Sequence, residues 1–214
     1  MPPKFTPQSA EADLAFLRSI VQGGQDGGRA HLTLGVAYLA GGLLYGLQCL
    51  YHAGQAVGWI RWPDPVNLVF VIAISVAFML VLTWAVREDR KIESAGPIVT
   101  RTMNAAFSGA GMANVAIIII FAAGSARDQD FATWLYYPAI VFVMQAAAWF
   151  VAYSLRKRPW MLATSLGGWA TAVALGLLVR EVEIYLAVCT VALFVLFAGP
   201  GWIMTRGALK ARTA

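Results

Sequence analysis

The residues best suited to chemistry in this 214-residue sequence are two histidines and two cysteines, which all lie in or beside apolar runs. His31 and His52 stand at opposite ends of one predicted helix, about 32 Å apart by the rise of an α-helix. They therefore cannot hold one metal ion or one haem together within one chain. Cys49 and Cys189 lack the CxxC spacing of a zinc site and form no disulfide framework. We interpret them as two small buried hydrophobic residues.

The apolar runs contain no ionisable side chain in their interiors, because every Asp, Glu, Lys and Arg lies at the end of a run or between runs. Ion-coupled transporters, proton relays and voltage sensors hold such groups inside the bilayer. Hydrolysis in the membrane requires a nucleophile with a nearby base, or a metal with its ligands. We therefore predict a protein that is not an enzyme and has no catalytic residue, metal or cofactor. A haem held by His52 and a methionine such as Met112 or Met144 is the alternative that the sequence leaves open.

Uncharged polar residues do occur inside the runs, and the first run carries them on one face. Tyr38, Tyr45, Gln48 and His52 follow helical spacings of three, four and seven residues, while leucines fill the opposite face. Two interpretations are open. The polar face is either a seam of hydrogen bonds between helices or the wall of a binding cavity that opens outward near His52.

Asn114 and Gln145 lie near the middle of two consecutive runs, which a short connection makes antiparallel neighbours. We predict that their side chains bond to each other, a contact that contributes on the order of 0.6–2 kcal/mol in membranes. A polar contact for a ligand is the alternative, and Trp149 continues the polar line one turn beyond Gln145. The candidate ligand-binding residues are therefore Tyr38, Tyr45, Gln48, His52, Asn114, Gln145 and Trp149.

The elements that position these residues are membrane helices. Hydrophobic residues make up 59% of the chain and charged residues 13%, whereas soluble proteins have about 45–50% and about 25%. A run of about 20 apolar residues crosses a bilayer core of about 30 Å. We predict an all-α polytopic membrane protein, a bundle of six transmembrane helices at Leu32 to about Ala53, Val66–Val86, Met103–Ala123, Thr133–Tyr153, Pro159–Val179 and Glu183–Thr205.

The positive charges predict the orientation of the bundle. Of the 16 Lys and Arg residues, 13 fall in the two terminal segments and in the second and fourth connections. Short cytoplasmic loops retain positive charge, so both termini are predicted to be cytoplasmic. Arg outnumbers Lys by 12 to 4, which suggests a bacterial cytoplasmic (inner) membrane. The basic residues are scattered over short loops and not gathered on one face, so no nucleic-acid partner is expected.

Three regions are expected along the chain: a cytoplasmic N-terminal helix and glycine-rich joint at 1–30, the six-helix domain at 31–205 and a basic cytoplasmic tail at 206–214. The N-terminal helix is amphipathic, with Leu14, Leu17 and Val21 on its apolar side. It has a single Arg, whereas helices that lie on a membrane usually carry a basic row. Docking on the protein's own loops, binding a cytoplasmic partner and lying on the bilayer stay open.

Small residues recur at every fourth position in three runs, as Gly42/Gly46, Ala105/Gly109/Ala113 and Gly168/Ala172/Gly176. Such spacings allow helix backbones to approach closely in lipid. Packing within the chain, a homo-oligomer and a membrane-protein partner are all compatible with them. Gly199-Pro200-Gly201 is expected to end the sixth span near the membrane surface, with a hinge as the alternative.

The function favoured by these observations is binding: a membrane-embedded sensor, regulator or assembly partner that recognises a lipophilic ligand or another membrane protein. The alternative is a facilitative channel or transporter for a small neutral or amphipathic solute. Without a coupling charge inside the spans, such transport would run downhill.

Overall fold

The computed structural model describes residues 27–90 and 98–213, and this part of the chain is helical without strands. The helices are α2 (Gly27–Ala56), α3 (Asp64–Arg90), α4 (Ile98–Asp128), α5 (Phe131–Arg156), α6 (Pro159–Leu177), α7 (Val182–Ala192), the π-helix η1 (Leu193–Ala198) and α8 (Gly199–Thr213). Six helical spans in it are long and apolar enough to cross a membrane, with α7, η1 and α8 together forming the sixth. The prediction of an all-α fold with six helices long and apolar enough to cross a membrane is confirmed. The amphipathic helix predicted with Leu14, Leu17 and Val21 lies outside the described residues.

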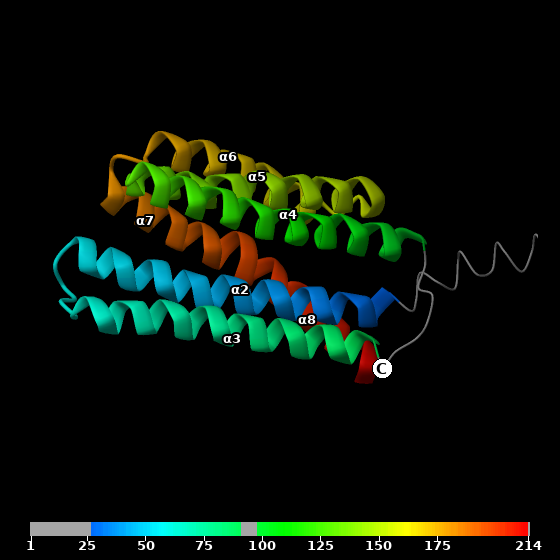
Figure 1. The fold of residues 1–214 in the computed structure, drawn as a ribbon. Helices are drawn as coiled ribbons and strands as arrows, with labels where there is room; N and C mark the ends of the chain where they lie inside the picture. Colours follow the sequence, from blue (N-terminus) through cyan, green and yellow to red (C-terminus); the bar gives the residue numbers. More distant parts are fainter. Residues whose placement is uncertain (1–26, 91–97, 214) are drawn as a thin grey trace, which may run out of the picture.

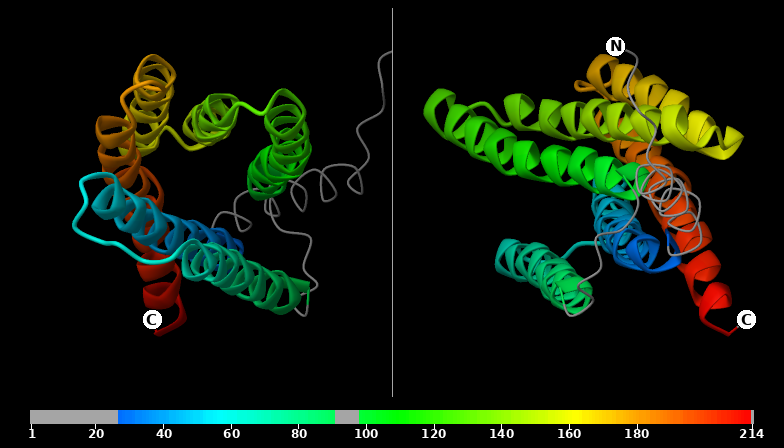
Figure 2. Two further views of the ribbon diagram at one scale, coloured as in Figure 1. Left: turned by 60° about the vertical axis from the view of Figure 1, so that its left-hand side comes forward. Right: turned by 90° about the vertical axis from the view of Figure 1, so that its right-hand side faces the viewer.

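The six spans form an open arc. Neighbouring contacts run from α3 to α2, from α2 to the sixth span, and then through α6 and α5 to α4. The sixth span lies obliquely across the bundle and connects the layer of α4, α5 and α6 to the layer of α2 and α3 (Figure 1). The views in Figure 2 show α3 and α4 at the two ends of this arc.

The two helices at the ends of the arc are the least buried. Only 6% of the residues in the most apolar stretch of α4 and 11% of those in α3 are buried, compared with 22–33% in the other four spans. α3 packs mainly against α2, and α4 mainly against α5. Both helices therefore offer most of their surface to lipid or to a binding partner.

The basic residues gather at one end of the bundle, where α2 and α4 begin and α8 ends (Figure 1). We call this the basic end; the described basic residues in the last turns of α3, α5 and α8, in the first turn of α4 and in the connection between α5 and α6 lie there. At the other end, which we call the opposite end, the side chains of Arg127 and Asp128 form an exposed ion pair with Nε–Oδ1 at 2.7 Å.

Glycines bring α2 and the sixth span into backbone contact. A Cβ atom added at Gly42 would lie 2.3 Å from the backbone nitrogen of Ala198 and 2.8 Å from the carbonyl oxygen of Leu193. From the other side, a Cβ at Gly201 would lie 2.3 Å from the backbone nitrogen of Leu39. No larger residue fits without separating the helices. The Gly42/Gly46 spacing therefore serves packing within the chain, whereas the space opposite Gly109 on α4 is empty.

The prediction that Gly199-Pro200-Gly201 ends the sixth span is wrong. The helix continues without a break from η1 into α8, which ends at Thr213. Proline normally disrupts a helix because it lacks the N–H group and its ring collides with the carbonyl four residues earlier. Here the wider turns of the π-helix precede Pro200, and the N–H of Gly199 bonds to the carbonyl of Phe194 five residues earlier. The described part of the predicted tail, residues 206–213, continues this helix.

The core consists of two hydrophobic clusters. Leu135, Phe142, Leu175, Tyr185 and Cys189 are among the buried residues of the first, which joins α5, α6 and α7 in the half of the bundle toward the opposite end. The second joins α2, α4, α5, α6 and α8 in the half toward the basic end, and its buried members are Tyr38, Met103, Phe107, Ala148, Trp149, Ala152, Met161 and Met204. Packing in these two clusters sets the rotation of α2 and α5 about their own axes, and so the directions in which their polar side chains point.

Candidate functional site

The seven candidate residues from the sequence separate into three places. Tyr38, Gln145 and Trp149 lie in the core of the basic half. Tyr45, Gln48 and Asn114 lie nearer the middle of the bundle. His52 belongs to a hydrogen-bond network at the opposite end.

Tyr38 is the centre of an aromatic cluster and is 7% exposed. Its ring centroid lies 5.2 Å from that of Trp149 and 5.5 Å from that of Phe107, both edge to face, and it stacks on Phe197 at 5.2 Å. Its hydroxyl donates a hydrogen bond to Oε1 of Gln145. Edge-to-face and stacked pairs contribute about 0.5–1.5 kcal/mol each beyond the burial of their surface. The bond between Tyr38 and Gln145 joins α2 to α5, as expected of a seam between helices, whereas Nε1 of Trp149 is buried with no hydrogen-bond partner among the described residues.

The predicted bond between Asn114 and Gln145 is therefore absent, and that prediction is wrong. Gln145 accepts from Tyr38 on α2 instead. The physical reason is the rotation of α5, which turns Gln145 toward α2 because Trp149, one turn further, is drawn into the aromatic cluster. Asn114 lies beside the hydroxyl of Tyr137 on α5, an interaction that the sequence did not suggest.

The middle of the bundle holds a second polar group, which we call the central polar site: Tyr45 and Gln48 of α2, Ser75 of α3, Asn114 of α4 and Tyr137 of α5. Tyr45 lies close to the Ser75 side chain and to Tyr137, which in turn lies close to Asn114. Gln48 follows Tyr45 by one turn of α2. The site thus draws on four spans and contains no described ionisable carboxylate, amine or imidazole.

Two oxygen atoms in the central polar site have unmet hydrogen-bonding capacity. Oε1 of Gln48 and Oδ1 of Asn114 are buried, and among the described residues no donor meets either of them within hydrogen-bond distance and angle. A buried acceptor without a donor costs about 1–3 kcal/mol, so native proteins leave few of them. Both oxygens are buried, and the hydroxyl of Tyr137, which lies beside the Asn114 amide, does not meet Oδ1 with hydrogen-bond geometry. The site is therefore incomplete in this conformation.

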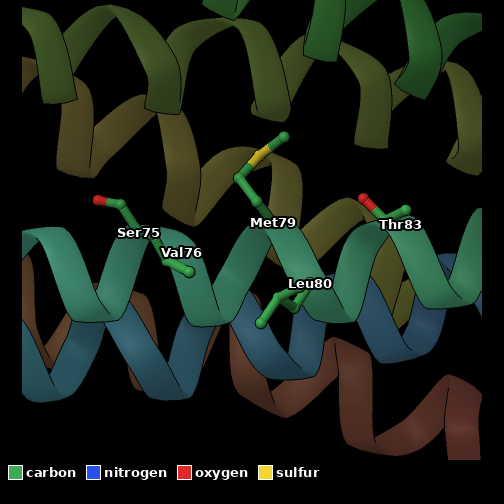
Figure 3. A pocket seen from close by; sticks show the side chains of 5 residues that line it. All are labelled: Ser75, Val76, Met79, Leu80 and Thr83. Carbon is green, nitrogen blue, oxygen red and sulfur yellow. The ribbon is translucent and has the colours of Figure 1, made fainter.

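A shallow hollow on α3 adjoins the central polar site. It has a volume of about 260 Å³ and is lined by Ser75, Val76, Met79, Leu80 and Thr83. In Figure 3 the side chains of Ser75, Met79 and Thr83 project from α3 toward the side on which α4 and α5 lie. Ser75 belongs both to the hollow and to the central polar site, so the hollow adjoins that site at Ser75.

His52 takes part in a network that joins the ends of α2 and α3. Asn67 Oδ1 accepts from the hydroxyl of Tyr51 and from Nε2 of Gln55, the latter at 2.8 Å. Oε1 of Gln55 then faces Nδ1 of His52 at 2.9 Å. Because an amide oxygen only accepts, Nδ1 of His52 is the donor in this bond.

Sequence reasoning missed Tyr51, Gln55 and Asn67 in this network, as well as Ser75 and Tyr137. Asn67 and Ser75 are single polar residues in the most uniformly apolar run, and no periodicity marks them. Tyr51 and Gln55 lie four residues apart, which is a helical spacing that would have paired them on one face. Tyr137 was not among the candidate residues taken from the sequence.

Comparison with known proteins finds no matching family model, no matching curated protein and no matching solved structure.

Proposed function

We propose that this chain is a non-enzymatic integral membrane protein that binds a lipophilic ligand carrying a hydrogen-bond donor. The observation that carries the proposal is the pair of buried amide oxygens without donors, on Gln48 and Asn114. A hydroxyl, amine or amide group of a ligand would supply what the central polar site lacks, and its apolar part would lie among the surrounding aliphatic side chains. Polar groups without a partner are common where a ligand completes the structure.

The arrangement of the spans supports entry from the bilayer. α3 and α4 stand at the ends of the arc and are little buried, so lipid-soluble molecules can reach the described surface of both helices. The hollow beside Ser75 and Met79 lies on this side. A ligand that arrives through lipid has already lost its water, so it gains the hydrogen bonds to the amides at little further desolvation cost.

The orientation belongs to the same proposal. With the basic end in the cytoplasm, as the distribution of Lys and Arg favours, the central polar site lies inside the membrane and the His52 network faces outward. A bacterial inner membrane is the compartment that the Arg-rich composition suggests. In this location the protein would act as a sensor, regulator or assembly partner whose state depends on the bound molecule.

The test is to identify what the protein retains. Wild type and the Asn114→Leu variant are purified in parallel from the same membranes in a mild detergent, and the small molecules are extracted and measured by mass spectrometry. We expect one lipophilic species with a donor group near stoichiometric amounts in wild type and at least tenfold depletion in the variant. The exposed-face variant Met112→Leu is the matched control on the same helix, since Met112 is 72% exposed. Equal retention in all three proteins would refute the proposal.

A facilitative transporter is the second candidate, and the continuity of polar residues favours it. Tyr45 and Gln48 lie toward the opposite end of α2 and Tyr38 toward the basic end, so one helix carries polar side chains along much of its length. In the described conformation the aromatic cluster around Tyr38 fills the basic half. Transport would therefore require that cluster to open. The test uses liposomes loaded with the small molecule that the purified protein retains. If liposomes that contain the protein release this molecule no faster than empty liposomes do, this function is excluded.

A further inference from the structure

The two cysteines of the chain lie side by side in the folded protein. Sγ of Cys49 on α2 is 3.7 Å from Sγ of Cys189 on α7, although 140 positions separate them in the sequence. Both are free thiols, Cys189 being buried and Cys49 half-buried. The sequence interpretation treated them as two unrelated small hydrophobic residues, and the fold makes them a pair.

The packing around the pair holds the two helices in place. One turn before Cys189, the hydroxyl of Tyr185 donates to the carbonyl oxygen of Leu135 at 2.7 Å and so ties α7 to α5. Near Cys49, Gly46 packs against the ring of Phe194, where an added Cβ would come within 3.0 Å. A disulfide bond is about 2.05 Å long, so the sulfurs need to approach by roughly 1.7 Å.

We propose that Cys49 and Cys189 are a redox-active pair that closes to an intramolecular disulfide. Both S–H bonds break and one S–S bond forms, and two protons and two electrons pass to a lipid-soluble quinone, which becomes the quinol. The sulfurs lie within membrane spans among apolar side chains, so the oxidant has to dissolve in the bilayer, as a quinone does. The proposal is independent of the ligand-binding function.

A disulfide fits this position better than a metal site. Two thiolates with one monovalent soft cation would leave a net negative charge in the apolar interior, which is costly. The dithiol and the disulfide are both uncharged. The described residues also offer no group of three or more His, Cys, Asp or Glu side chains that could hold a metal.

The bond would join α2 to the sixth span four residues before η1 begins at Leu193. A π-helix is a point at which a helix can change its register. The disulfide would therefore fix α7, the half of the sixth span nearer the opposite end, to α2 at a point next to Gln48.

The test uses the full-length protein in liposomes, with a fully substituted ubiquinone analogue as oxidant because such a quinone forms no thiol adduct. We expect the mass to fall by about 2 Da, both thiols to lose reactivity toward N-ethylmaleimide after denaturation, and a non-reduced digest to contain the linked peptides. Dithiothreitol should restore both thiols. Free thiols after oxidation would overturn the proposal.

Relocating one sulfur provides the control for geometry. Cys49→Ser combined with Leu50→Cys keeps two thiols in the chain but places one on the lipid-facing side of α2, where Leu50 is 52% exposed. We expect disulfide formation with Cys189 to be at least tenfold slower in this variant. An equal rate would show that proximity in the fold plays no part. Cys189→Ser alone should yield no intramolecular linkage, and any linkage between two chains would then appear as a covalent dimer.

Discussion

Replacing Asn114 by leucine tests the claim that the central polar site is incomplete. Oδ1 of Asn114 is buried without a donor, whereas Oδ1 of Asn67 accepts from both Tyr51 and Gln55. The two asparagines lie in membrane spans of the same protein, and the same substitution removes an unsatisfied group at one position and a satisfied group at the other. The two variants should therefore change the stability in opposite directions.

The magnitudes follow from the bonds at each position. Removing an unpaired buried acceptor returns about 1–3 kcal/mol, and loss of the contact between Asn114 and Tyr137 subtracts about 1 kcal/mol. Asn114→Leu should therefore stabilise the ligand-free protein by roughly 0–2 kcal/mol. Asn67→Leu leaves two buried or half-buried donors, on Tyr51 and Gln55, without an acceptor and should destabilise the protein by about 2–4 kcal/mol.

Thermal unfolding in detergent measures the difference. At about 2–4 °C per kcal/mol for a chain of this size, a gap of about 4 kcal/mol between the centres of the two ranges places the Tm of Asn114→Leu roughly 8–16 °C above that of Asn67→Leu. The comparison requires both proteins to be stripped of bound molecules, because a retained ligand stabilises wild type. If Asn114→Leu is destabilised as much as Asn67→Leu, the amide of Asn114 is a structural clamp and the reasoning fails.

Three further outcomes are expected. Gly42→Ala should lower the free energy of unfolding by at least about 3 kcal/mol, since its Cβ would lie 2.3 Å from the backbone of Ala198. Gly109→Ala should stay within about 1 kcal/mol of wild type, because the space opposite Gly109 is empty. Thermal unfolding of both variants checks this, and equal values would contradict the close contact between α2 and the sixth span at Gly42. Tyr38→Phe should lower the stability by about 1–2 kcal/mol because Oε1 of Gln145 loses its donor, and an unchanged unfolding midpoint would argue against that bond. A fluorescent protein fused to the C-terminus should be fluorescent, because the C-terminus is expected in the cytoplasm. An enzyme reporter that is active only outside the cytoplasm should be active when it is inserted beside Arg61. The reverse pattern would show that the protein has the opposite orientation.

The number and type of the spans could be predicted from sequence because hydropathy over about 20 residues reflects one dominant constraint, the satisfaction of the backbone in lipid. The two-sided character of α2 was also visible, since Tyr38 is buried while Leu43, Leu47 and Leu50 are each about half exposed. Both features depend on periodicity within a single segment. Periodicity does not depend on which helices become neighbours.

The errors concern features that depend on neighbours. Asn114 and Gln145 were paired because their helices are consecutive, but the rotation of each helix is set by bulky residues such as Trp149, which draw α5 toward α2. The sixth span was expected to end at Gly199-Pro200-Gly201 because proline disrupts an α-helix, and a π-helix removes that conflict. The Cys49–Cys189 pair joins residues 140 positions apart, which no local spacing indicates.

A structure of the protein purified with its retained molecule, determined by electron cryomicroscopy in lipid nanodiscs, tests the central claim most directly. Density that does not belong to the protein should lie in the central polar site, within hydrogen-bond distance of the amides of Gln48 and Asn114, with the neighbouring side chains turned aside to admit it. If the two amides instead bond to each other or to neighbouring side chains, and the site contains no such density, the protein does not bind a ligand there.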